Sequence, residues 1–132
     1  MITRRTCLGG LASLALRAAD RPVTVLLRSG WQSVNIGDIT HTPGALRLLE
    51  KAMPRAEVIL WPAEIERGVE PMLLRRFPKL SIAKGTLDET GKPTTPELRA
   101  AFEESGLCLH GSAAGVQSPA LFESWHKLTG KP

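Results

Sequence analysis

Cysteine is scarce in this sequence of 132 residues, which contains only Cys7 and Cys108. Because Cys7 lies in a segment that we interpret below as an export signal, we expect no structural disulfide between the two. Cys108 lies in the apolar run "GLCLHG", where a cysteine is usually buried as a small hydrophobe, although a reactive thiol is the alternative. The residues His41, His110 and His126 are far apart, and no Cys or His pair has the spacing of zinc ligands. We therefore expect neither a metal nor a cofactor.

An excess of positive charge is absent from most of the chain, although the net charge is +4. Arg4, Arg5 and Arg17 lie in the first nineteen residues, where there is no Asp or Glu. Without these three, 14 of the 17 basic residues stand against 13 acidic residues, which is close to neutrality. The sequence therefore predicts no nucleic-acid partner. With 42% hydrophobic and 23% charged residues, it has the composition of one globular domain.

The sequence also lacks an apolar run of the roughly 20 residues that a membrane-spanning helix needs, so no membrane span is expected. The segment 1–19 combines the paired Arg4 and Arg5, a short apolar run at 7–16 and small residues at 18–19. This layout is typical of an export signal. The letters "TRRTCLG" resemble the twin-arginine export motif, from which they depart at two positions. A used signal would place the protein in the periplasm or at the cell surface. The alternative is a frayed amphipathic helix at the terminus of a cytoplasmic protein.

After this segment, apolar runs alternate with helical patterns. The expected strands are 22–30, 56–63, 79–85 and 107–111. The helix expected after the first strand begins with Thr42 as its N-cap and Pro43 as its first helical residue, and Pro54 ends it. Three further helices are expected at 66–78, 95–105 and 118–129.

Strands that alternate with helices of about ten residues predict an α/β fold. We expect residues 22–132 to form a Rossmann-like, doubly wound parallel sheet of about four strands with helices on both faces. With right-handed crossovers, the natural strand order is 3-2-1-4. Ligands of such sheets bind at the carboxyl ends of the strands where the order reverses, here between the first and fourth strands.

A long polar stretch, "NIGDITHTPG", follows the first strand and is predicted to be a loop that shapes a cleft. Gly37 allows unusual backbone angles or a close backbone approach. Asn35 and Asp38 can bind ligand hydroxyls, or they can simply bond neighbouring backbone and hold the turn. His41 is a further candidate, and a helix that starts at Thr42 would offer free N–H groups to an anion.

A second polar stretch, "HGSAAGV", follows the fourth strand. His110 at the end of that strand can donate to a bound carboxylate or phosphate, or it can serve packing alone. Gly111 and Ser112 form the turn that follows. Neither polar stretch matches the phosphate-binding P-loop or the dinucleotide fingerprint. Among the tryptophans, only Trp31 is predicted to lie in a loop, where it can stack on a sugar ring.

The stretches "VNIGDITHTPGALRLLEKAMPRAEVILWP", "GVEPMLLRRFPKL" and "LCLHGSAAGV" resemble the amino-terminal half of the polysaccharide pyruvyl transferase family. That family has an Asn-x-Gly-Asp loop after an apolar strand, matched here by Asn35, Gly37 and Asp38. It also has a later polar glycine turn, matched by His110, Gly111 and Ser112. The resemblance covers about residues 23–132.

The resemblance implies a fold like half of a two-domain glycosyltransferase-B enzyme, and transfer of a pyruvyl group from phosphoenolpyruvate to a sugar of a cell-surface polysaccharide. The family continues into a second domain beyond the point where this sequence ends, so we expect catalysis to require a carboxyl-terminal half. The alternative is a non-enzymatic module that binds a carbohydrate or a small anion. The candidate catalytic residues are His110 and Asp38. The candidate substrate-binding residues are Asn35, Gly37, His41, Thr42, Gly111 and Ser112.

Overall fold

Strands and helices alternate throughout the part of the chain that the structure, a computed structural model, describes, namely residues 21–30, 36–113 and 119–132. The elements are β1 (Thr24–Gly30), α2 (Ile36–Ala52), β2 (Glu57–Pro62), α3 (Val69–Arg76), β3 (Ser81–Ile82), α4 (Pro96–Glu104), β4 (Leu107–Ala113) and α5 (Ala120–Thr129).

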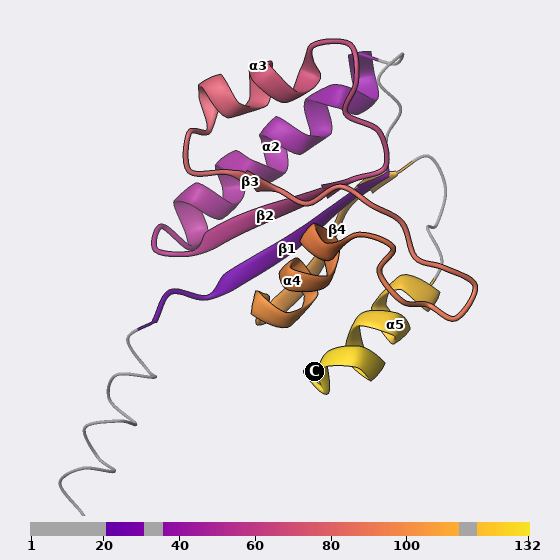
Figure 1. The fold of residues 1–132 in the computed structure, drawn as a ribbon. Coiled ribbons are helices and arrows are strands. Elements are labelled where there is room, and N and C mark those ends of the chain that lie inside the picture. Colours follow the sequence, from indigo (N-terminus) through magenta and orange to yellow (C-terminus); the bar gives the residue numbers. More distant parts are fainter. Residues whose placement is uncertain (1–20, 31–35, 114–118) are drawn as a thin grey trace, which may run out of the picture.

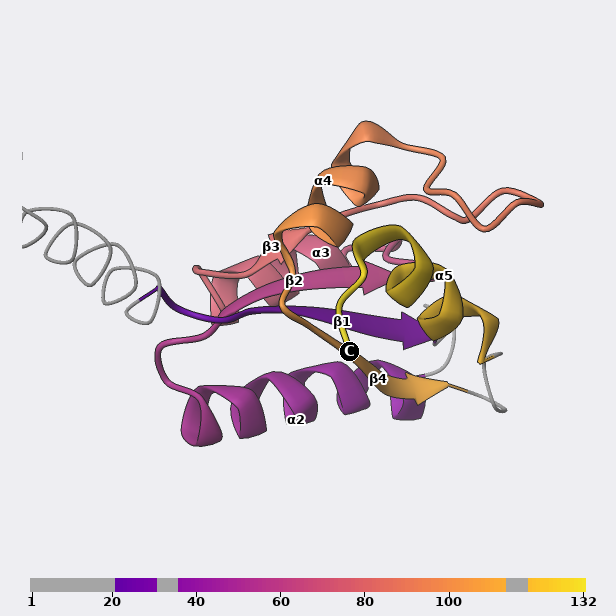
Figure 2. The ribbon, with the colours of Figure 1, turned by 90° about the horizontal axis from the view of Figure 1, so that it is seen from below.

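The four strands form one parallel sheet in the order β3-β2-β1-β4, as the sequence predicts. Figure 2 looks onto the face covered by α4 and α5 and shows the strands side by side with their carboxyl ends at the same edge. The central strand β1 is apolar because both of its faces are covered, and Val25, Leu26 and Leu27 are almost completely buried. The α/β Rossmann-like fold is therefore confirmed.

Helices cover both faces of the sheet, with α2 and α3 on one side and α4 and α5 on the other (Figure 1). Side chains alternate between the faces along each strand, so Leu27 packs toward α2 and α3 and Leu26 toward α4 and α5. The first core includes Leu27, Leu46, Leu60, Ile65, Val69, Leu73, Phe77 and Leu80. The second includes Leu26, Ile59, Trp61, Ala83, Leu98, Ala101, Phe102 and Trp125.

Helix α2 begins at Ile36, and the expected start at Thr42 is therefore wrong. Pro43 lies inside the helix, where it cannot donate to the carbonyl oxygen of Ile39. The packing of the first turns against the sheet offsets this loss: Ile39 contacts the first core, and Thr42 is buried. Thr42 is thus not an N-cap, and it offers no free helix terminus to an anion.

The two outermost strands, β3 and β4, also differ from the bounds predicted from the sequence. β3 consists of only two residues, Ser81 and Ile82, in line with the weak apolar run there. β4 continues through Gly111 to Ala113, so the expected turn at His110, Gly111 and Ser112 is wrong. His110 is consequently a residue within the edge strand β4, which pairs with β1.

Candidate functional site

The candidate site lies where the strand order reverses, toward the carboxyl ends of β1 and β4. These strands pair in parallel from Val25 and Leu107 onward, and Arg28 stands opposite His110. The register shifts between Arg28 and Gly30, so the two strands are not regular at this edge. In an open α/β sheet this is the position at which ligands bind.

Arg28 lies near the carboxyl end of β1 and faces α4 and α5, because its neighbour Ser29 faces α2. Its Nη1 donates to the carbonyl oxygen of Trp61 at 3.4 Å, and its guanidinium carbon lies 4.5 Å from the centre of the Trp61 ring. Its Nε is buried, and within the described ranges it has no hydrogen-bond partner. No carboxylate of the described residues pairs with Arg28. Burial lowers the pKa of this guanidinium by desolvation, yet an arginine stays charged near neutral pH.

The Trp61 ring, on which Arg28 rests, is held rigidly. Its Nε1 donates to the carbonyl oxygen of Gly85 at 2.8 Å, and its ring meets that of Phe102 edge to face at a centroid distance of 5.4 Å. Gly85 has a φ of +143°, and a Cβ there would lie 2.6 Å from Oγ1 of Thr95. Only glycine therefore suits this position, and the platform under Arg28 is fixed by backbone geometry.

His110 is the neighbour of Arg28 on β4. Its Nδ1 lies 3.1 Å from the carbonyl oxygen of Gly111, and its ring is tilted against the ring of Phe122 in α5 at a centroid distance of 6.1 Å. Its Nε2 is buried and meets no hydrogen-bond partner among the residues described. We call the residues Arg28, Trp61, His110 and Phe122 the switch-point cluster. Two of its buried nitrogen atoms, Nε of Arg28 and Nε2 of His110, have no hydrogen-bond partner among the described residues.

The opposite face of the same edge is closed by polar packing. The hydroxyls of Ser29 and Thr42 are hydrogen-bonded at 2.9 Å, and both residues are buried. A Cβ on Gly111 would lie 3.3 Å from the carbonyl oxygen of Arg28, so this glycine lets β4 approach β1 closely. Thr42 and Gly111 therefore have structural roles that explain their identity without a ligand.

The remaining predicted residues are dispersed. Gly37 and His41 are exposed on α2, and the Gly37 carbonyl oxygen accepts from the Thr40 hydroxyl at 2.7 Å. Asp38 lies in the first turn of α2 and Ser112 in β4, but their side chains are not among those described. Asn35 and Trp31 lie outside the described residues. A cleft shared by Asp38 and His110 stays a prediction.

Sequence reasoning missed Arg28 because it searched the loops for cations. The signal was present: Arg28 is the one charged residue in "VTVLLRSG", a strand that is buried on both faces. A charge in such a run is costly unless it is paired or functional. β1 ends two residues later, at Gly30, so the cation lies near the carboxyl end of the strand.

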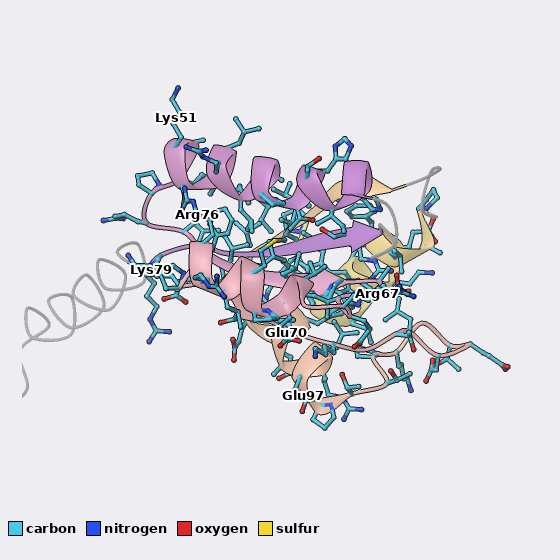
Figure 3. The ribbon with its side chains drawn as sticks, turned by 90° about the horizontal axis from the view of Figure 1, so that it is seen from above. Lys51, Arg67, Glu70, Arg76, Lys79 and Glu97 are labelled. Atoms are coloured by element: carbon cyan, nitrogen blue, oxygen red, sulfur yellow. The ribbon has the colours of Figure 1, made fainter. Side chains whose placement is uncertain are left out.

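A groove of about 750 Å³ lies at the opposite, amino-terminal edge of the sheet. Its floor belongs to the first core, and its rim carries Arg55, Arg76, Lys79 and the acidic Glu50 and Glu57. Figure 3 shows Arg76 and Lys79 toward the end of the molecule at which β1 begins. Arg76 pairs with Glu50 at 3.8 Å, and basic residues at helix carboxyl ends are favourable for the helix itself. The groove is therefore a second place with cations, but one without an unpaired buried charge among the described residues.

Two further searches cover the described ranges only. They contain no group of three or more His, Cys, Asp or Glu side chains placed to hold a metal ion. They also contain no helix with the length and apolar character needed to cross a membrane.

Comparison of the chain with protein-family models, with curated protein sequences and with solved structures gave no significant match. The resemblance to pyruvyl transferases thus rests on the motifs alone. One of them, the Asn-x-Gly-Asp stretch, differs in structure from the expected loop, because Gly37 and Asp38 lie in the first turn of α2.

Proposed function

We propose that the protein binds a small anion at the switch-point cluster, with Arg28 as the residue that holds it. The observation that carries this proposal is the environment of Arg28: a partly buried cation at the ligand-binding edge of the sheet, without a carboxylate partner in the described chain. Taking a charge out of water is unfavourable unless an opposite charge or strong hydrogen bonds compensate. An anionic ligand supplies both.

The chemistry of arginine indicates the class of anion. A guanidinium presents its N–H groups in a planar fork that matches the two oxygens of a carboxylate or phosphate. The contact with the Trp61 ring leaves the fork oriented, because Trp61 is itself fixed. A preoriented cation loses little side-chain entropy when a ligand binds. Carboxylates and phosphates are therefore the ligands to test.

Pyruvyl transfer is the second candidate, and the resemblance of the motifs supports it. Phosphoenolpyruvate carries about three negative charges, and a site for it generally needs several converging cations. Arg28 supplies one cation to this edge of the sheet. The proposal is that transfer needs further basic residues from a second domain, as the resemblance implies, and that this chain alone binds the donor weakly.

The binding proposal is tested by titrating the protein with inorganic phosphate and with phosphoenolpyruvate in a calorimeter. A hydrogen bond to a charged group contributes about 1.5–3 kcal/mol. Losing it in Arg28→Gln should therefore weaken anion binding by about tenfold or more. Arg28→Lys should bind phosphate more weakly than the wild type but more tightly than Arg28→Gln, because lysine keeps the positive charge but lacks the planar guanidinium fork. Arg99→Gln is the matched control, since Arg99 is exposed on α4.

Equal binding of phosphate by the wild type and by Arg28→Gln would refute the proposal. Pyruvyl transfer is tested separately, by incubating the chain with phosphoenolpyruvate and an acceptor that contains galactose or N-acetylmannosamine. Acceptor-dependent phosphate release by the chain alone would show that its own four β-α units are sufficient for transfer, against the expectation above.

A further inference from the structure

The groove at the amino-terminal edge of the sheet, which we call the amino-terminal groove, has the size and lining of a small-molecule site. Its volume of about 750 Å³ lies within the range of about 300–1,000 Å³ that is usual for ligand pockets, which are mostly apolar with a few polar groups. It is formed by the carboxyl end of α2, the start of β2 and the segment that follows α3. The apolar residues that line it are Leu46, Leu49, Met53, Pro54, Ala56, Val58, Phe77, Pro78 and Leu80.

The apolar lining of the groove continues into the first core. Leu46, Phe77 and Leu80 are buried there, whereas Leu49 and Val58 pack against the core but are only partly buried. Since these last two side chains line the groove, an apolar ligand in it would remove exposed apolar surface from water. Such removal is favourable, so the lining favours a ligand with an aliphatic part.

The walls of the groove are joined to each other. Glu50 at the end of α2 pairs with Arg76 at the end of α3 at 3.8 Å. The guanidinium carbon of Arg76 lies 4.7 Å from the centre of the Phe77 ring. Pro54 and Pro78 stiffen the chain after the two helices, because the proline ring fixes φ. The groove is therefore preformed, and a ligand pays little for ordering it.

The charges on the lining favour an anionic group at one end of such a ligand. The charged lining residues are Glu50, Arg55, Glu57, Arg76 and Lys79, among which the basic residues outnumber the acidic ones. Arg76 is already paired with Glu50. Lys79 is exposed, and none of the ion pairs among the described residues includes it. Lys79 is therefore the cation of the lining best placed to pair with an anionic ligand.

We propose that the amino-terminal groove binds a small amphiphilic anion, with its aliphatic chain on the apolar lining and its carboxylate at Lys79. The chemical class is that of medium-chain carboxylates. This site is separate from the anion site proposed at Arg28, which lies toward the other edge of the sheet, so either proposal can fail without the other. Inorganic phosphate has no aliphatic chain and gains little in the groove.

Octanoate, butanoate and octanol test the two parts of the ligand in NMR titrations of the full chain and of Arg28→Gln at pH 7.5. Each fully buried methylene strengthens binding by about fourfold, so octanoate should bind more than about tenfold more tightly than butanoate. An exposed ion pair adds a factor of about two to five, and octanoate should exceed octanol by that factor. Amide shifts are expected at Leu49, Met53 and Phe77, in Arg28→Gln as in the wild type.

Two variants with matched controls assign the ends of the ligand. Lys79→Gln should weaken octanoate binding about two- to fivefold and leave octanol binding unchanged. Lys51→Gln is its control, because Lys51 is exposed, does not line the groove and points away from Lys79 (Figure 3). Met53→Gln should weaken the binding of both ligands, whereas Met72→Gln, at an exposed position on α3 outside the lining, should weaken neither.

Several results would overturn the proposal. Equal binding of octanoate and octanol, or equal effects of Lys79→Gln and Lys51→Gln, would refute the pairing of the carboxylate with Lys79. Octanoate shifts that vanish in Arg28→Gln would assign the ligand to the other edge of the sheet. An absence of shifts in the groove would also refute the proposal, including the case in which residues 1–20 or a second copy of the chain fills it; sedimentation velocity identifies the second copy. Amide spectra that match those of the wild type establish that the variants are folded.

Discussion

Replacing Arg28 by methionine should make the protein more stable while it abolishes anion binding. Among the described residues, the guanidinium has one long hydrogen bond, at 3.4 Å, and its buried Nε has no partner. An unsatisfied buried group costs about 1–3 kcal/mol, whereas the contact with the Trp61 ring contributes about 0.5–2 kcal/mol. Methionine fills the same irregular space with a flexible apolar chain. We therefore expect a gain of about 1 kcal/mol in the free energy of unfolding.

The measurement is urea denaturation of the wild type and of Arg28→Met in buffer without phosphate or carboxylates. A gain of about 1 kcal/mol would raise the melting temperature of a domain of this size by roughly 4 °C. The m-value should stay the same, since the surface exposed on unfolding hardly changes. For Arg99→Met, at an exposed position, the free energy of unfolding should stay within about 0.5 kcal/mol of the wild-type value.

A loss of 1 kcal/mol or more in Arg28→Met would refute this reasoning. It would mean that the guanidinium stabilises the fold, and that its burial needs no ligand to explain it. A gain in stability together with lost phosphate binding is the pattern expected of a residue retained for function.

Three further outcomes are expected. Ser105→Ala should lower the free energy of unfolding by about 1–3 kcal/mol, because the Ser105 hydroxyl accepts from the buried Trp125 indole at 2.9 Å; in urea denaturation the exposed control Ser81→Ala should change little. Burial raises the pKa of Cys108 from 9.0 to about 11. The unfolded chain therefore releases this proton first, and the contribution of Cys108 to stability, complete below pH 9, is lost as the pH rises toward 11; rapid reaction of the native thiol with a disulfide reagent at pH 8 would contradict this. Deleting residues 1–19 should leave the melting temperature unchanged if they are an export signal, and a large drop would refute that interpretation.

The order of the strands was predictable because it depends on patterns that are long and redundant. The run from Val25 to Leu27 is apolar without alternation, which identifies a strand covered on both faces. The alternation of four such runs with helical patterns then leaves few topologies. The weak run at Ser81 and Ile82 likewise became a very short strand. Strand order thus followed from many residues at once.

The start of α2 was not predictable, because local preference and tertiary packing oppose each other there. Thr42 followed by Pro43 has the letters of a helix start. The helix nevertheless begins at Ile36, since Thr42 is buried against Ser29, thirteen residues earlier in the sequence. Rules that consider only neighbouring residues cannot predict the contact between Ser29 and Thr42.

The candidate site was only partly predictable. The reversal of strand order pointed to the edge at which the candidate site is proposed, and His110 was among the predicted residues. The burial of Nε of Arg28 and Nε2 of His110 without a hydrogen-bond partner among the described residues depends on three-dimensional contacts. The charge in the strand was visible in the sequence, but the importance of Arg28 depends on its pairing, which the sequence does not show.

The central claim, that this edge of the sheet binds an anion, is tested most directly by following backbone amide signals in an NMR titration with inorganic phosphate. The account predicts that the largest shifts occur at Arg28, Ser29, His110 and Gly111, and that Arg28→Gln removes them. Shifts confined to the groove at the opposite edge, around Arg76 and Lys79, would contradict the claim and assign anion binding to the other end of the sheet.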